Sequence, residues 1–125
     1  MEKILAVGLG GALGSLGRYI IAILAGKLTA LNFPLGTFIV NIAGSLLIGF
    51  CWNYFDKIHI NNEFRLFIFT GFLGGFTTFS TFTRETVQFF KAHEPYHAIS
   101  YLLISNIAGV AAVMCGFYLS YRISR

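Results

Sequence analysis

Residues 71–83 read GFLGGFTTFSTFT and lie inside an apolar stretch that runs from about residue 64 to residue 90. Paired glycines in this segment are followed by several hydroxyl side chains, which interrupt the pattern of an apolar helix. A broken helix leaves backbone carbonyls without helical partners, and a membrane tolerates this only where they are buried in protein or line a site. The segment therefore predicts a membrane helix that is broken in mid-membrane.

Two phenylalanines follow the glycines at a spacing of one helical turn, Phe79 and Phe82. The edge of a phenylalanine ring is electropositive, so two edges can solvate a small anion without holding it as tightly as a fixed charge does. Carbonyls of broken helices coordinate Na⁺ in other membrane proteins. The chain has 14 phenylalanines, and any one alone indicates packing or lipid contact. Only their combination with the glycine break predicts an ion site.

The composition of the whole chain indicates a membrane protein. Of 125 residues, 56% are hydrophobic and only 11% are charged, and the mean hydropathy is +0.72, whereas soluble domains have about 25% charged residues. A membrane helix needs about 20 mainly apolar residues. Four windows qualify, at about residues 4–25, 35–55, 64–90 and 98–121. We expect an all-α membrane protein, with residues 1–125 forming a single four-helix domain whose third helix is broken.

The basic residues are almost evenly divided between the two sides of the expected membrane domain. The side of the termini holds Lys3, Lys57, Arg65, Arg122 and Arg125, and the other side holds Arg18, Lys27, Arg84 and Lys91. Orientation follows such Lys/Arg asymmetry, so this near balance predicts insertion in both orientations and an antiparallel homodimer. The alternative is that the count is uninformative and the termini are cytoplasmic. Four short helices enclose little interior, which favours a dimer. The basic residues do not form a stripe interleaved with aromatic residues, so the sequence does not indicate nucleic-acid binding.

Polar side chains follow one face of the second and fourth windows. Thr37, Asn41 and Ser45 stand at i, i+4 and i+8, and Tyr101 and Ser105 at i, i+4, so each set shares a helix face. One interpretation is hydrogen bonding between helices, worth about 1 kcal/mol. The other is a row of groups that line a pore.

Arg18 is a cation within an apolar window, beside Tyr19. A charged side chain there must reach the interface or face water. It predicts either an interfacial anchor or an electropositive vestibule that attracts anions.

Three other classes of protein fit the sequence less well. A small proton-coupled cation or multidrug transporter needs a carboxylate deep in the membrane, but every acidic residue lies near the end of a window. A membrane assembly subunit explains the small residues but not the glycine break with its hydroxyls and phenylalanines. An enzyme is disfavoured because the H-E-x-x-H match at residues 93–97 contains Pro95, which disrupts the helix that a zinc site requires.

Three segments together resemble the fluoride channel family (Fluc, also called CrcB). They are Gly17–Tyr19 (GRY), Gly36–Ser45 (GTFIVNIAGS) and Gly71–Phe82 (GFLGGFTTFSTF), and the length and the number of spans match as well. The resemblance implies a fluoride-selective channel that passively exports F⁻ from the cytoplasm and relieves fluoride toxicity. It further implies a multi-pass protein of the bacterial inner membrane that forms an antiparallel homodimer of dual topology.

The resemblance also implies roles for particular residues. It places an amide donor to fluoride on Asn41 and an aromatic box on Phe79 and Phe82. Neighbouring hydroxyls fall on Ser80 and Thr81, and the family's polar track falls on Tyr101 and Ser105. Arg18 would lie near the vestibule, and the backbone carbonyls of Gly74 and Thr77 would hold a central structural Na⁺. Gly109 and Val113 replace later hydroxyls of the family's polar track. Glu85 either faces the pathway or acts with Arg84 at the interface.

Overall fold

The computed structural model describes residues 1–30 and 32–125, and within these ranges the only regular elements are helices. In chain order they are α1 (Glu2–Leu28), α2 (Leu35–Phe55), α3 (Asn62–Arg65), the π-helical η1 (Leu66–Leu73), α4 (Gly74–Phe76), α5 (Phe79–Lys91) and α6 (Pro95–Ile123). Taken together, α3 to α5 make one span, so four helical segments are long and apolar enough to cross a membrane. Each window expected from the sequence lies inside one of them, which confirms the all-α membrane class.

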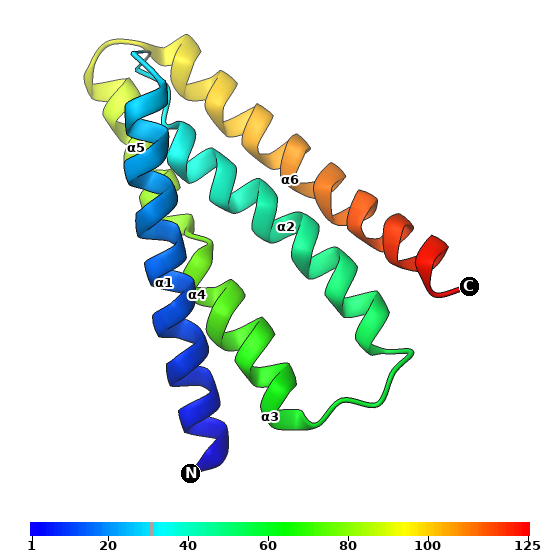
Figure 1. Cartoon of the computed structure of the whole chain (residues 1–125). Helices are drawn as coiled ribbons and strands as arrows, with labels where there is room; N and C mark the ends of the chain where they lie inside the picture. The colour runs from blue at the N-terminus through cyan, green and yellow to red at the C-terminus, as the bar shows by residue number, and fades with distance from the viewer. Residues whose placement is uncertain (31) are drawn as a thin grey trace.

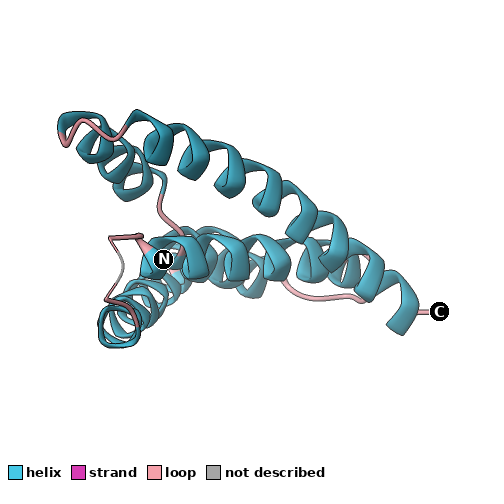
Figure 2. Cartoon of the chain, turned by 90° about the horizontal axis from the view of Figure 1, so that it is seen from above, coloured by secondary structure: helices cyan, strands magenta, loops and turns pink. Residues whose placement is uncertain are grey.

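The helices form two closely packed groups. α1 lies against η1 and α4, whereas α2 lies along α6 (Figure 1). α5 leaves the first group and packs against the beginning of α6, so the third span connects both groups. Viewed from above, α6 and α5 form one edge of the molecule and α1 lies at the other (Figure 2).

Glycines determine how closely α1 approaches the third span. A Cβ atom added to Gly10 or Gly14 of α1 would collide with backbone atoms of Phe67 or Phe72. Conversely, a Cβ on Gly75 of α4 would lie 2.6 Å from the carbonyl oxygen of α1 residue 11. Small residues allow this backbone contact, which van der Waals packing stabilises in lipid, where helices gain little from the hydrophobic effect.

Glycine also allows close backbone contact between α2 and α6, with one such glycine on each helix. A Cβ on Gly49 would collide with the backbone of Val113, and a Cβ on Gly116 with the carbonyl of Leu46. Side-chain hydrogen bonds add to this packing near the far end of α6, where the amide of Asn53 donates to the Ser120 hydroxyl at 3.1 Å.

Local signals explain where several helices begin. The Asn61 side chain accepts a hydrogen bond from the Phe64 N–H at 2.8 Å and caps α3. Pro95 occupies the first turn of α6, where its missing N–H costs nothing. α5 begins after Thr78, whose hydroxyl caps it, and this start belongs to the candidate site.

Candidate functional site

Two residues with extended backbone separate α4 from α5. Thr77 has φ −85° and ψ 159°, and Thr78 has φ −150° and ψ 118°, so neither continues the helix. No proline causes this interruption, because the two prolines of the chain are Pro34 and Pro95. Side-chain hydrogen bonds stabilise it instead.

Side chains take two of the N–H groups that would bridge the interruption in a continuous helix. The Thr78 N–H donates to Oδ1 of Asn41 at 2.8 Å, and the Thr81 N–H donates to the Thr78 hydroxyl at 3.2 Å. In a continuous α-helix these N–H groups bond the carbonyls four residues earlier, which belong to Gly74 and Thr77. Both carbonyls have therefore lost their helical donors.

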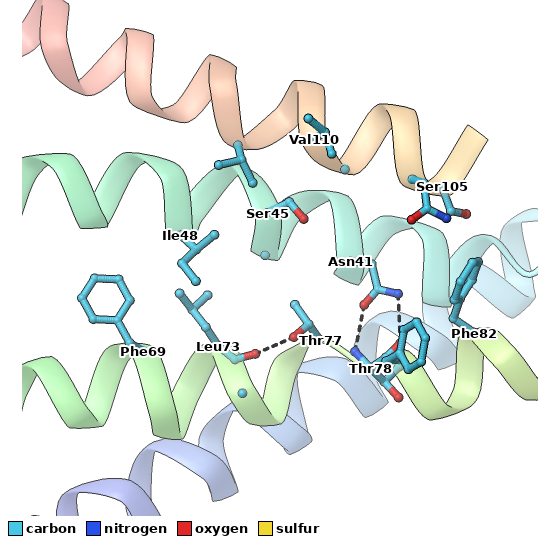
Figure 3. A pocket seen from close by; sticks show the side chains of 16 residues that line it. Asn41, Ser45, Ile48, Phe69, Leu73, Thr77, Thr78, Phe82, Ser105 and Val110 are labelled. Carbon is cyan, nitrogen blue, oxygen red and sulfur yellow. Dashed lines mark hydrogen bonds between the residues drawn. The ribbon is translucent and has the colours of Figure 1, made fainter. Parts of the chain in front are cut away.

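Asn41 on α2 makes hydrogen bonds to both backbone polar groups of Thr78. Besides accepting from the Thr78 N–H, its Nδ2 donates to the Thr78 carbonyl at 3.0 Å (Figure 3). Since an amide nitrogen has two N–H groups, one of them remains for another acceptor. The structure therefore gives Asn41 the hydrogen bonds between helices that were one of the two interpretations of its polar face.

An open groove of about 520 Å³ runs beside the interruption, between α2, η1, α4, the start of α5 and α6 (Figure 3). Of the ten residues to which the resemblance gives a role at the pathway, the vestibule or the Na⁺ site, six line the groove, namely Asn41, Gly74, Thr77, Phe79, Phe82 and Ser105. The Ser105 hydroxyl is buried, and within the described ranges it has no hydrogen-bond partner. Burying a hydroxyl without a partner costs free energy, so the Ser105 hydroxyl is available to bind a ligand in the groove.

The two expected aromatic residues lie together but differ in burial. The ring centroids of Phe79 and Phe82 are 6.0 Å apart, while Phe79 is 77% exposed and Phe82 only 6%. The Phe82 ring also lies 5.0 Å from that of Tyr101. Phe82 is thus fixed by the protein, and Phe79 projects from a single copy of the chain.

Glu85 lies behind these rings and accepts two short hydrogen bonds. The Thr37 hydroxyl donates to one carboxylate oxygen at 2.7 Å, and the Tyr101 hydroxyl donates to the other at 2.8 Å. No ion pair between Glu85 and Arg84 forms in the described part of the chain. Sequence reasoning had placed Thr37 and Tyr101 on separate polar faces and missed that one carboxylate joins them.

The remaining predicted residues lie outside the groove. Ser80 is exposed on another side of α5, beside Thr83 and Arg84. Thr81 is half-buried, and its hydroxyl accepts from that of Thr78 at 3.1 Å. Arg18 is half-buried on α1 and is not among the groove residues.

Backbone carbonyl oxygens, rather than carboxylate, imidazole or thiolate side chains, are the groups available for a cation beside the interruption. The described residues contain no cluster of three or more His, Cys, Asp or Glu side chains that could hold a metal ion. The carbonyls of Gly74 and Thr77, which have lost their helical donors, suit a hard cation such as Na⁺, because unwound carbonyls coordinate Na⁺ in other membrane proteins. The residues present therefore fit the ion that the resemblance implies.

Comparison with known proteins extends this picture to the whole chain. Residues 5–117 match the model of the family described as CrcB-like protein, Camphor Resistance (CrcB). The chain belongs to the CrcB-like family. The family was expected from the GRY, GTFIVNIAGS and GFLGGFTTFSTF segments, and that expectation is confirmed.

Curated relatives of this CrcB-like chain are named as fluoride channels. A protein from Desulfotalea psychrophila, named Fluoride-specific ion channel FluC, is 55% identical over 119 residues, covering 95% of this chain and 92% of the relative. A protein of the same name from Phocaeicola vulgatus is 42% identical over 120 residues, covering 96% and 99%. The family is thus one of fluoride-specific ion channels and not of enzymes, as the sequence predicted.

Proposed function

We propose that this chain conducts fluoride passively across a bacterial inner membrane and that the groove beside the interruption forms part of its pathway. One observation carries the proposal. The groove gathers a buried hydroxyl without a partner, an asparagine with an unused N–H and two phenylalanine rings. Fluoride is compact and strongly hydrated, so a pore must replace its water with donors that bind it weakly enough for release.

The donors that would replace water are distributed along the groove. The remaining N–H of Asn41 and the hydroxyl of Ser105 can donate to an anion, and the edges of Phe79 and Phe82 can solvate it. Export then follows from fluoride chemistry. HF crosses the membrane, dissociates in the less acidic cytoplasm, and leaves F⁻ trapped until a channel releases it.

We propose further that two chains assemble as an antiparallel, dual-topology homodimer. Phe79 is 77% exposed and the groove is open in a single chain, so an isolated chain does not enclose an anion. A second copy would close the groove and double the number of free carbonyls from Gly74 and Thr77 that face a central Na⁺. The bound ion would fix the interruption, while the groove residues would conduct fluoride.

The experiment that tests the function is fluoride efflux from liposomes. Purified protein would be reconstituted in vesicles loaded with fluoride, and release would be followed with a fluoride electrode before and after a potassium shunt is opened with valinomycin. We expect rapid release that requires the shunt, no release from chloride-loaded vesicles, and loss of release in Phe82→Ile.

A proton-coupled cation or multidrug transporter, the alternative from sequence, predicts a different outcome. It would give no shunt-dependent fluoride release, and a pH gradient would drive cation uptake. Absence of fluoride release from protein that elutes as a single folded species would overturn the channel proposal.

A further inference from the structure

Phe33 is a loop residue that the family resemblance did not single out. It lies between α1 and α2, next to Pro34, and its ring is half-buried. The ring meets that of Tyr101 at 5.6 Å and 85° between planes, and that of Phe38 at 5.7 Å and 68°. Both contacts are edge-to-face, which is a favoured arrangement of aromatic pairs. A side chain from a loop is thereby fixed against two membrane spans.

Phe33 also stands at the boundary between two pockets at this end of the molecule. One pocket has a volume of about 430 Å³ and extends toward α5 and the start of α6. The other, of about 220 Å³, extends toward the end of α1. Among the described residues, Phe33, Pro34 and Glu85 alone line both pockets. Phe33 therefore lies between two spaces that both reach Glu85.

A row of aromatic rings connects this boundary to the groove. Phe33 contacts Tyr101, the Tyr101 ring lies 5.0 Å from Phe82, and Phe82 lies 6.0 Å from Phe79. Tyr101 is the central member, because its ring touches both neighbours while its hydroxyl donates to Glu85 at 2.8 Å. Tyr101 is only 1% exposed, so its rotamer depends on the rings packed around it.

We propose that Phe33 is a positioning residue for fluoride conduction, acting through Tyr101. Its ring edge keeps Tyr101 in the rotamer that reaches Glu85 and supports Phe82. Without the Phe33 ring, the two pockets merge and Tyr101 loses its support on that side. This inference rests on the proposed channel function and adds to it a residue on the loop between the first two spans.

The test compares Phe33 variants with a matched phenylalanine at the opposite end of the molecule. Phe33→Ala is expected to lower the initial fluoride efflux rate by about 3- to 10-fold. Loss of the edge-to-face pair with Tyr101 should lower the population of the supported Tyr101 rotamer by about this factor. Phe33→Tyr, which keeps the ring, should restore most of the rate. Phe64→Ala is the control, because Phe64 also lies near the start of a span and stacks on Phe67 at 6.4 Å, but it does not contact Tyr101. It should conduct like the wild type.

A double-mutant cycle tests whether Phe33 acts through Tyr101. In the Tyr101→Ala background, Phe33→Ala should cause little further loss of efflux. Fully additive losses, or wild-type efflux in Phe33→Ala, would overturn the proposal. All variants would be compared at equal incorporation and with matched elution from a sizing column. If wild-type protein does not release fluoride, the proposed function fails first; if it does and Phe33→Ala matches it, only the present inference fails.

Discussion

The first half of the third span, η1 and α4, and its second half, α5, are held by different kinds of contact. η1 and α4 lie backbone to backbone against α1, with glycines at the contact. By contrast, side-chain hydrogen bonds fix α5, from Asn41 at its start and from Thr37 and Tyr101 at Glu85. Backbone contact tolerates no added atom, whereas a hydrogen-bonded contact can be weakened in steps. Substitutions in the two halves should therefore differ in size and in whether they affect folding or conduction.

The largest effect is expected in the glycine contact. In Gly14→Ala the new methyl group would collide with the backbone carbonyl of Phe72, which cannot rotate away as a side chain can. We expect a loss of more than about 3 kcal/mol of stability, at the upper end of overpacking effects. Thermal unfolding in detergent, followed by fluorescence of the single tryptophan, Trp52, measures it.

Gly8→Ala provides the matched control for this prediction, because nothing lies within 4 Å of a Cβ atom added at Gly8. It should unfold like the wild type. Equal stabilities of the Gly14 and Gly8 variants would show that α1 and the third span do not pack as described.

A smaller effect on folding, with a severe effect on conduction, is expected at the start of α5. Asn41→Ala removes both hydrogen bonds to Thr78, and we expect a loss of about 2 kcal/mol together with loss of fluoride efflux. Asn62→Ala serves as the control, because this exposed amide at the start of α3 lies outside the groove. If Asn41→Ala conducted like the control, Asn41 would have no part in the pathway or in its bracing.

At Glu85 the change should be smaller still. Glu85→Gln keeps one acceptor oxygen for Thr37 or Tyr101 and places an amide NH₂, which cannot accept, opposite the other hydroxyl, so the contact weakens by about 1 kcal/mol. Thermal unfolding should detect the loss, and Glu63→Gln should not change stability, because in the described part of the chain this half-buried side chain at the start of α3 makes no hydrogen bond or ion pair. No difference between the two variants would contradict the bonds from Thr37 and Tyr101.

The smallest effect on stability, with opposite sign, is expected at Ser105. Its buried hydroxyl has no partner in the described part of the chain, so Ser105→Ala should leave stability unchanged or raise it by up to about 1 kcal/mol. Fluoride efflux should nevertheless fall, because a donor to the permeating ion is lost. A clear loss of stability would indicate that this hydroxyl has a structural partner instead.

Much of this arrangement was predictable from sequence, because lipid imposes strong constraints on composition and spacing. Hydropathy predicts the four spans, and the 71–83 segment indicates where the third one changes character. The alignment of Asn41 and Ser45 on one face of α2 likewise anticipates that both line the groove. These properties depend on neighbours in sequence, which a periodic pattern records.

Contacts between distant residues were not predictable in the same way. The Thr37–Glu85–Tyr101 cluster joins residues 48 and 16 positions apart, and no local pattern specifies such pairing. The π-helical turn of η1 also lacks a recognisable signal. The capping role of Thr78 had a signal, since threonine commonly precedes a helix, but the neighbouring Thr77, Ser80 and Thr81 offered the same signal.

The interruption of the third span has a consequence for the order in which the protein is made. Asn41 bonds to both backbone polar groups of Thr78, and α2 is synthesised before Thr78 emerges from the ribosome. The side chain that holds this segment is therefore already present when the segment is made. The Glu85 carboxylate, in contrast, must wait for Tyr101 on the last span. Because the chain is made from its N-terminus, the Asn41–Thr78 contact at the ion site could form before α6 is synthesised, whereas the Glu85–Tyr101 contact could not.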